Sequence, residues 1–168
     1  MKKHLSILSS IVAFMVLVAF TPINDSDTFF QIDTEKSVVN WEGTKVTGKS
    51  HSGTVKLTEG GLQLSEGAIT GGKFTIDMTT INVTDLDGGM KQKLEGHLKN
   101  KDFFAVEKFK TANLVILGVD GDKVKANLTI KGKTHEVVFP TKVVVKDGML
   151  EATAKIAVDR AKYDVRYG

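Results

Sequence analysis

The run Lys123-Val124-Lys125-Ala126-Asn127-Leu128-Thr129-Ile130-Lys131 decides the fold of this chain. Apolar and polar residues alternate along it with a period of two, the period at which side chains alternate between the two faces of a β-strand. The same alternation recurs over residues 73–78 and 150–159. Strands with one apolar face and one polar face are typical of antiparallel sheets that cover a core on one side.

Turn signals separate the alternating runs and set the strand boundaries. Asp120-Gly121 and Asp147-Gly148 are hairpin markers, because these residues tolerate a positive φ, and Glu59-Gly60-Gly61 also reads as a turn. The sequence therefore predicts strands near residues 29–33, 37–47, 50–58, 61–64, 67–81, 111–119, 122–131, 134–145 and 149–158. Long, consecutively connected antiparallel strands leave an unpaired edge unless their sheet closes. We predict an all-β, extended up-and-down antiparallel barrel in one domain, with a bulge or a bend at Gly71-Gly72 where the barrel curves.

One helix is expected inside this β chain, between the strands near residues 81 and 109. Met90, Leu94 and Leu98 are four residues apart and so share one helical face. Asp85 or Asp87 is placed to cap the start of the helix. We expect a helix from Met90 to Leu98 that, with the Phe103-Phe104 pair after it, covers one end of the barrel.

The beginning of the chain indicates export. Lys2 and Lys3 precede an apolar run from Ile11 to Phe20, so residues 1–22 resemble a secretory signal peptide and residues 23–168 form the barrel domain. An uncleaved anchor is the alternative. The absence of cysteine excludes disulfides and the cysteine-linked lipoprotein route. A periplasmic or secreted location is expected, and the small net charge of +3 argues against a nucleic-acid partner.

Catalytic constellations are missing from the sequence. His51, His97 and His135 are not at metal-ligand spacing, and there is neither a phosphate-binding glycine loop nor a nucleophile-elbow serine. We expect no enzyme activity, no metal and no cofactor, and a hydrolase or isomerase that uses His51 or His135 is the weakest hypothesis. His51 and Val55 are four residues apart in a predicted strand, so their side chains point to the same, inward face. His51 therefore either contacts a ligand head group at the mouth of the barrel or bonds to a neighbouring backbone group.

The apolar, inward-facing residues have two interpretations. A barrel of about eight strands either fills its interior with side chains or holds one small ligand. Burying each methylene of a long hydrocarbon contributes roughly 0.8 kcal/mol, so such a ligand needs no charged pocket. The candidate ligand-binding residues are Trp41, His51, Phe74, Ile76, Met78, Leu98, Phe103, Phe104, Leu114, Ile116, Leu128 and Ile130.

Four motifs occur in order along the chain. They are Phe30-Gln31-Ile32-Asp33, then Gly96-His97-Leu98-Lys99 with Asp102-Phe103-Phe104, then residues 128–134, and finally Asp159-Arg160 before Tyr163-Asp164-Val165. With these motifs the chain, over residues 29–168, resembles the YceI-like family of exported, lipocalin-like lipid-binding proteins. The resemblance implies a barrel whose hydrophobic cavity holds a polyisoprenoid, an isoprenoid quinone or a similar amphiphilic lipid, for sequestration or transport.

Two departures from the family pattern bear on the fold. Lys108-Phe109-Lys110 replaces a step in which the family usually has a proline, and the sequence stops at Tyr167-Gly168, where the family usually continues into a closing strand. We therefore expect a barrel that lacks its C-terminal closing strand. A ligand-free structural or protein-interaction barrel is the alternative function. A transient membrane contact and a homodimer remain open as further partners.

Overall fold

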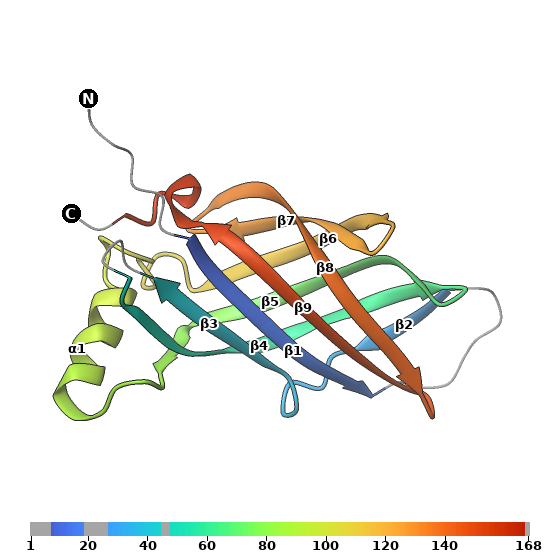
Figure 1. Ribbon diagram of the computed structural model, residues 1–168, viewed down its shortest axis with the longest axis horizontal. Helices are drawn as coiled ribbons and strands as arrows, with labels where there is room; N and C mark the ends of the chain where they lie inside the picture. Colours follow the sequence, from blue (N-terminus) through green and yellow to red (C-terminus); the bar gives the residue numbers. More distant parts are fainter. Residues whose placement is uncertain (1–7, 19–26, 45–47, 167–168) are drawn as a thin grey trace.

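Figure 1 shows the computed structural model, which describes residues 8–18, 27–44 and 48–166. Its elements in chain order are β1 (Leu8–Val18), β2 (Asp27–Gln31), β3 (Val38–Thr44), β4 (Ser50–Ser65), β5 (Ala68–Val83), α1 (Gly88–Lys99), β6 (Thr111–Asp120), β7 (Lys123–Ile130), β8 (Lys133–Lys146), β9 (Met149–Asp159) and the 3₁₀ helix η1 (Arg160–Tyr163). The predicted strands are thus found within a few residues of their expected bounds, apart from one merger and one addition.

The described strands form a single antiparallel sheet that curls on itself. From β3 to β9 every strand pairs with its neighbours in sequence, and β1 lies between β9 and β3. The pairing of β4 with β5 joins the two sides of the sheet, while β2 pairs with the second half of β4. The prediction of an all-β, up-and-down antiparallel barrel with one helix is confirmed.

Strand β1 is the addition. It pairs with β9 from Leu8 to Val18 and with β3 from Ser9 to Phe14. Because this segment falls within residues 1–22, the position between β3 and β9 is filled by part of the predicted signal peptide. The rest of residues 1–22 lies outside the described residues. The signal peptide, its removal and the expected lack of a C-terminal closing strand stay predictions.

The expected break at Glu59-Gly60-Gly61 is wrong, because β4 runs through it without a turn. A Cβ on Gly60 would lie 2.4 Å from the Lys73 carbonyl oxygen, and one on Gly61 would lie 2.4 Å from the Phe29 ring. The glycines therefore allow neighbouring strands to approach closely, a use of glycine in strands that resembles a turn signal in sequence. The irregularity expected near Gly71 is present, as a register shift beside its partner Gln63.

Helix α1 meets the barrel mainly through its C-terminal part. Leu98 is buried, whereas Met90 is 68% exposed, so the expected common apolar face over Met90, Leu94 and Leu98 is wrong at its first residue. Asp87 is the N-cap residue but makes no side-chain capping bond. Polar contacts attach the helix to the end of β5 instead: the Val83 N–H donates to the Glu95 carboxylate at 2.9 Å.

The two ends of the barrel carry different connections (Figure 1). We call the end that carries residues 84–110, the turn at Lys131-Gly132 and η1 the helix end. The opposite end carries the turns at residues 66–67, 121–122 and 147–148, and we call it the hairpin end. The core lies between them, on the inward faces of the strands.

Candidate functional site

An apolar cavity of about 80 Å³ lies inside the barrel. Five predicted ligand-binding residues line it: Phe74, Ile76, Leu114, Ile116 and Leu128. They lie on β5, β6 and β7, where antiparallel register sets Phe74 opposite Leu114 and Leu114 opposite Leu128. Directly opposed residues of an antiparallel pair point to the same face. Local alternation and register together therefore explain why these residues meet at one wall of the cavity.

Sequence reasoning missed the rest of the cavity wall. The additional lining residues come from β3, β4, β5, β7, β8 and β9, and they are Val39, Leu57, Leu62, Ile69, Val124, Phe139, Thr141, Ala152, Thr153, Ala154, Ile156 and Val158. Most of them follow the same period-two pattern as the five predicted residues. Alternation along residues 150–158 was a usable signal for the β9 contribution. Small residues at Ala152 and Ala154 leave the space that larger side chains would fill.

Thr141 gives the cavity wall an unusual polar atom. Its Oγ1 is buried and has no hydrogen-bond partner. The residue sits where β8 leaves β7: its N–H donates to the Asp122 carbonyl oxygen at 3.4 Å, beyond the last ladder pair at Pro140. A buried hydroxyl without a partner is destabilising, by roughly 1–3 kcal/mol in protein mutational data. Thr141 therefore offers an unused hydrogen bond to any group that enters the cavity.

The remaining predicted ligand-binding residues lie around the cavity rather than on its wall. Met78, Leu98 and Ile130 are buried in the core, and Trp41, Phe103 and Phe104 pack against it partly buried. Trp41 covers Gly53, where an added Cβ would lie 2.5 Å from the indole, and its Nε1 donates to the Thr54 carbonyl oxygen. Their part in ligand binding stays a prediction.

His51 bonds to a carboxylate and not to a neighbouring backbone group. Its Nδ1 lies 2.8 Å from Asp85 Oδ2, and Asp85 Oδ1 accepts from the Ser52 N–H at 3.0 Å. Desolvation raises the pKa of Asp85, but the hydrogen bonds from Ser52 and His51 outweigh it and hold the pKa below its usual value. This contact ties the start of the connection before α1 to β4.

Two segments close the helix end of the barrel. The first segment is η1 with the residues that follow it. Tyr163, at the end of η1, and Val165, two residues later, are each only 1% exposed. Phe103 and Phe104 contribute from the other side and meet edge to face, with ring centroids 4.9 Å apart. The Arg160 guanidinium lies 5.2 Å from the Phe103 centroid and so joins the two segments. The helix α1 is thus a smaller part of this cover than the sequence predicted, and η1 a larger one.

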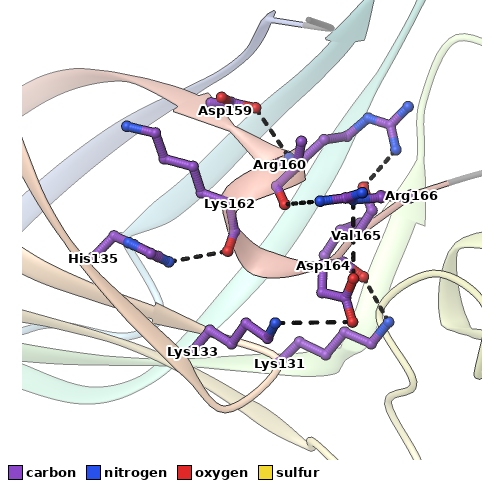
Figure 2. Close-up of polar contacts among 10 residues, drawn as sticks. Lys131, Lys133, His135, Asp159, Arg160, Lys162, Asp164, Val165 and Arg166 are labelled. Carbon is purple, nitrogen blue, oxygen red and sulfur yellow. Dashed lines mark hydrogen bonds and ion pairs between the residues drawn. The ribbon is translucent and has the colours of Figure 1, made fainter. Parts of the chain in front are cut away.

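Hydrogen bonds hold η1 in place (Figure 2). Asp159 caps it by accepting from the Ala161 N–H at 3.0 Å, and Arg160 Nη1 donates to the Val165 carbonyl oxygen at 2.6 Å. His135 Nε2 lies 3.0 Å from the Lys162 carbonyl oxygen. Burial raises the pKa of the Tyr163 phenol to about 12, with a smaller contribution from Asp159. Of the candidate catalytic histidines, His51 and His135 therefore both make contacts that fasten connections to strands.

Two further observations concern only the described residues. No group of three His, Cys, Asp or Glu side chains within residues 8–18, 27–44 and 48–166 is arranged to hold a metal ion. Among the same residues, no helix is both long enough and apolar enough to span a bilayer. The cavity wall offers hydrocarbon, aromatic rings and threonine hydroxyls, which suit the binding of an apolar group.

Comparison with known proteins agrees with the four sequence motifs. The family model described as YceI-like domain matches residues 30–168. The crystal structure of BcnA from Burkholderia cenocepacia is similar at 14% sequence identity and a TM-score of 0.40, over 89% of this chain and 96% of that chain. No curated protein matches the chain. Because the family match spans every strand from β3 to β9 together with α1 and η1, the chain belongs to the YceI-like family.

Proposed function

We propose that this protein binds a long-chain amphiphilic lipid, a polyisoprenoid or an isoprenoid quinone, and sequesters or transports it outside the cytoplasm. The observation that carries the proposal is the apolar cavity within the barrel, between the inward faces of strands from β3 to β9. Family membership supports it, because the YceI-like family binds polyisoprenoids and other lipids and is a binding family rather than an enzymatic one. The predicted leader over residues 1–22 supports an exported location.

The size of the cavity limits how the lipid enters. At about 80 Å³ it is smaller than an engineered apolar cavity of roughly 150 Å³ that admits benzene. A long hydrocarbon therefore fits only if side chains around the cavity move. Phe103 and Phe104 do not line the cavity, but they are only partly buried and cover the helix end, so their displacement would open the route by which the lipid enters. Each methylene that then enters contributes roughly 0.8 kcal/mol toward the cost of association.

Identification of a retained lipid tests the proposal directly. The full-length protein is purified from its own host under non-denaturing conditions and examined by native mass spectrometry and by lipid extraction. We expect one prenyl lipid for each barrel and uptake of an added isoprenoid quinone by the emptied protein. A protein that arrives empty and takes up neither a polyprenol nor a quinone contradicts the proposal.

A pair of tryptophan variants separates lipid binding from the alternative of a ligand-free barrel. Ile116→Trp places an indole in the cavity, whereas Val115→Trp places it on the outer face, where Val115 is 38% exposed. Lipid binding predicts that Ile116→Trp folds but retains less lipid, and that Val115→Trp retains as much as the natural protein. If Ile116→Trp only destabilises the fold, by the roughly 1–3 kcal/mol typical of overpacking, the ligand-free barrel is favoured.

A further inference from the structure

Charged residues are distributed unequally between the two ends of the barrel. At the helix end, residues 99–110, 131–135 and 159–166 contain nine Lys or Arg and four Asp or Glu, while residues 84–98 of the same end add two Lys and three Asp or Glu. At the hairpin end, residues 65–68, 120–123 and 146–149 contain two Lys and four Asp or Glu. The whole chain has a net charge of only +3, so this difference is a property of the fold rather than of the composition. We call the three segments 99–110, 131–135 and 159–166 of the helix end the cationic rim.

Contacts link the three segments of the cationic rim, and Figure 2 shows those between residues 131–135 and 159–166. Lys131 Nζ donates to the Asp164 carbonyl oxygen at 2.9 Å, which joins the β7–β8 turn to the segment after η1. The Arg160 guanidinium over the Phe103 ring joins η1 to residues 99–110. The same groups are far apart in the sequence. Only the closed barrel brings them to one end.

Six of the nine cations of the rim are exposed, whereas Lys99, Lys131 and Arg160 are partly buried. Lys133 and Arg166 both approach Asp164, at 4.0 Å and 3.9 Å, with side chains 52% and 71% exposed. One exposed carboxylate thus serves two cations at the limit of ion-pair distance, and such pairs contribute little. Lys162 is also exposed, and in Figure 2 its ammonium group extends away from Lys131, Lys133 and Asp164.

Buried neighbours hold these charges on a fixed support. Tyr163 and Val165, which alternate with Lys162, Asp164 and Arg166, are almost fully buried in the helix end. The chain here therefore points its apolar residues into the barrel and its charged residues outward. A group of exposed cations carried on a fixed backbone attracts an anionic partner.

We propose that the cationic rim docks the protein on an anionic phospholipid bilayer, with the helix end facing the membrane. This inference rests on the proposed lipid-binding function, because a hydrophobic lipid has to enter and leave through a membrane surface. The partly buried Phe103 and Phe104 belong to the first segment of the rim, so docking brings this cover of the helix end to the bilayer. Basic residues near an anionic leaflet each strengthen binding about fivefold at moderate salt.

Vesicle flotation tests the docking. The full-length protein is mixed with vesicles of three parts phosphatidylcholine to one part phosphatidylglycerol, or of phosphatidylcholine alone, at low and high salt. We expect binding only to the vesicles that contain phosphatidylglycerol, and less of it at high salt. The triple variant Lys133→Gln, Lys162→Gln, Arg166→Gln should bind about a hundredfold more weakly. Equal binding to both vesicle types, or no binding at low salt, overturns the proposal.

A control variant that loses the same number of positive charges distinguishes the effect of the rim from the effect of net charge. Lys123→Gln, Lys142→Gln, Lys146→Gln removes three exposed lysines at or near the hairpin end. It should bind the anionic vesicles almost as well as the natural protein, and an equal loss in both triple variants contradicts the assigned orientation. If the rim variant is unfolded by circular dichroism, Lys162→Gln alone should still weaken binding about fivefold. Native mass spectrometry of retained lipid is measured separately, so a failure of docking is distinguishable from a failure of lipid binding.

Discussion

Replacement of Thr141 by valine tests whether the cavity is as dry as its lining indicates. Valine has nearly the shape of threonine and the same preference for strands, so Thr141→Val removes the buried Oγ1 and little else. An unpartnered hydroxyl in apolar surroundings costs roughly 1–3 kcal/mol. We therefore expect the free energy of unfolding of the emptied protein to rise by about 1 kcal/mol, at the lower end of that range.

Thr75 supplies a matched control with the opposite sign. It is also buried, at 8% exposure, but its Oγ1 lies 3.1 Å from both Glu59 Oε1 and Asn113 Oδ1. Thr75→Val leaves those two acceptors without this hydroxyl and should lower the free energy of unfolding by about 1–2 kcal/mol. The same substitution in the same sheet is thus predicted to stabilise at one position and to destabilise at the other.

Urea denaturation followed by circular dichroism measures both variants. For a domain of this size a change of 1 kcal/mol moves the midpoint by about 0.5 M urea. The midpoint of Thr141→Val should rise and that of Thr75→Val should fall, at an unchanged slope. A lower midpoint for Thr141→Val would refute the reasoning, because it would mean that the hydroxyl has a partner, such as a water molecule within the cavity.

Three further predictions concern groups outside the cavity. Because the folded pKa of Asp85 lies below its ordinary value near 3.8, its contribution to stability is present above that pH and is lost as the pH falls through the folded pKa. Acid titration should therefore show a stability difference between the natural protein and Asp85→Asn that shrinks below pH 3.8, and a constant difference contradicts this. The pKa of Tyr163 is raised to about 12, so its contribution is present below the ordinary value near 10 and is lost as the pH rises toward 12; Tyr163→Phe should be less sensitive to alkaline unfolding over that interval. Proline in place of Ala13, within β1 between β3 and β9, should lower the stability of a chain that retains residues 1–22 by about 1–3 kcal/mol, and an unchanged melting curve argues against β1 as a member of the barrel.

The strands were predictable because their signals are local. The alternation along β7 predicts four buried residues, and Val124, Ala126, Leu128 and Ile130 are all buried. The Asp-Gly turns lie where the strands reverse. Glycine was ambiguous, since a turn and a close strand approach both require it. Gly60 and Gly61 serve the second purpose, and only the positions of Lys73 and Phe29 reveal it.

The candidate site was predictable on one wall. Phe74, Ile116 and Leu128 line the cavity as expected. The alternation within a single strand is enough to tell which of its side chains point inward. Their function as lipid contacts stays a prediction. Met90 shows the limit of the same reasoning: its spacing fits an apolar helical face, yet the polar contacts of α1 with β5 leave that residue outside the barrel. Helical periodicity identifies a face and does not identify what the face meets.

By itself, the sequence determined an antiparallel β fold with one helix, an apolar interior, no cysteine and the motifs of its family. These are matters of period, turn residues and composition, which act over a few residues. The tertiary structure decided which inward residues enclose space, that Thr141 faces it without a partner, and that Tyr163 and Val165 close the helix end. It also gathered cations from three separate segments onto one rim. Such features depend on strand register and barrel closure, which join residues remote in sequence, and no local pattern encodes them.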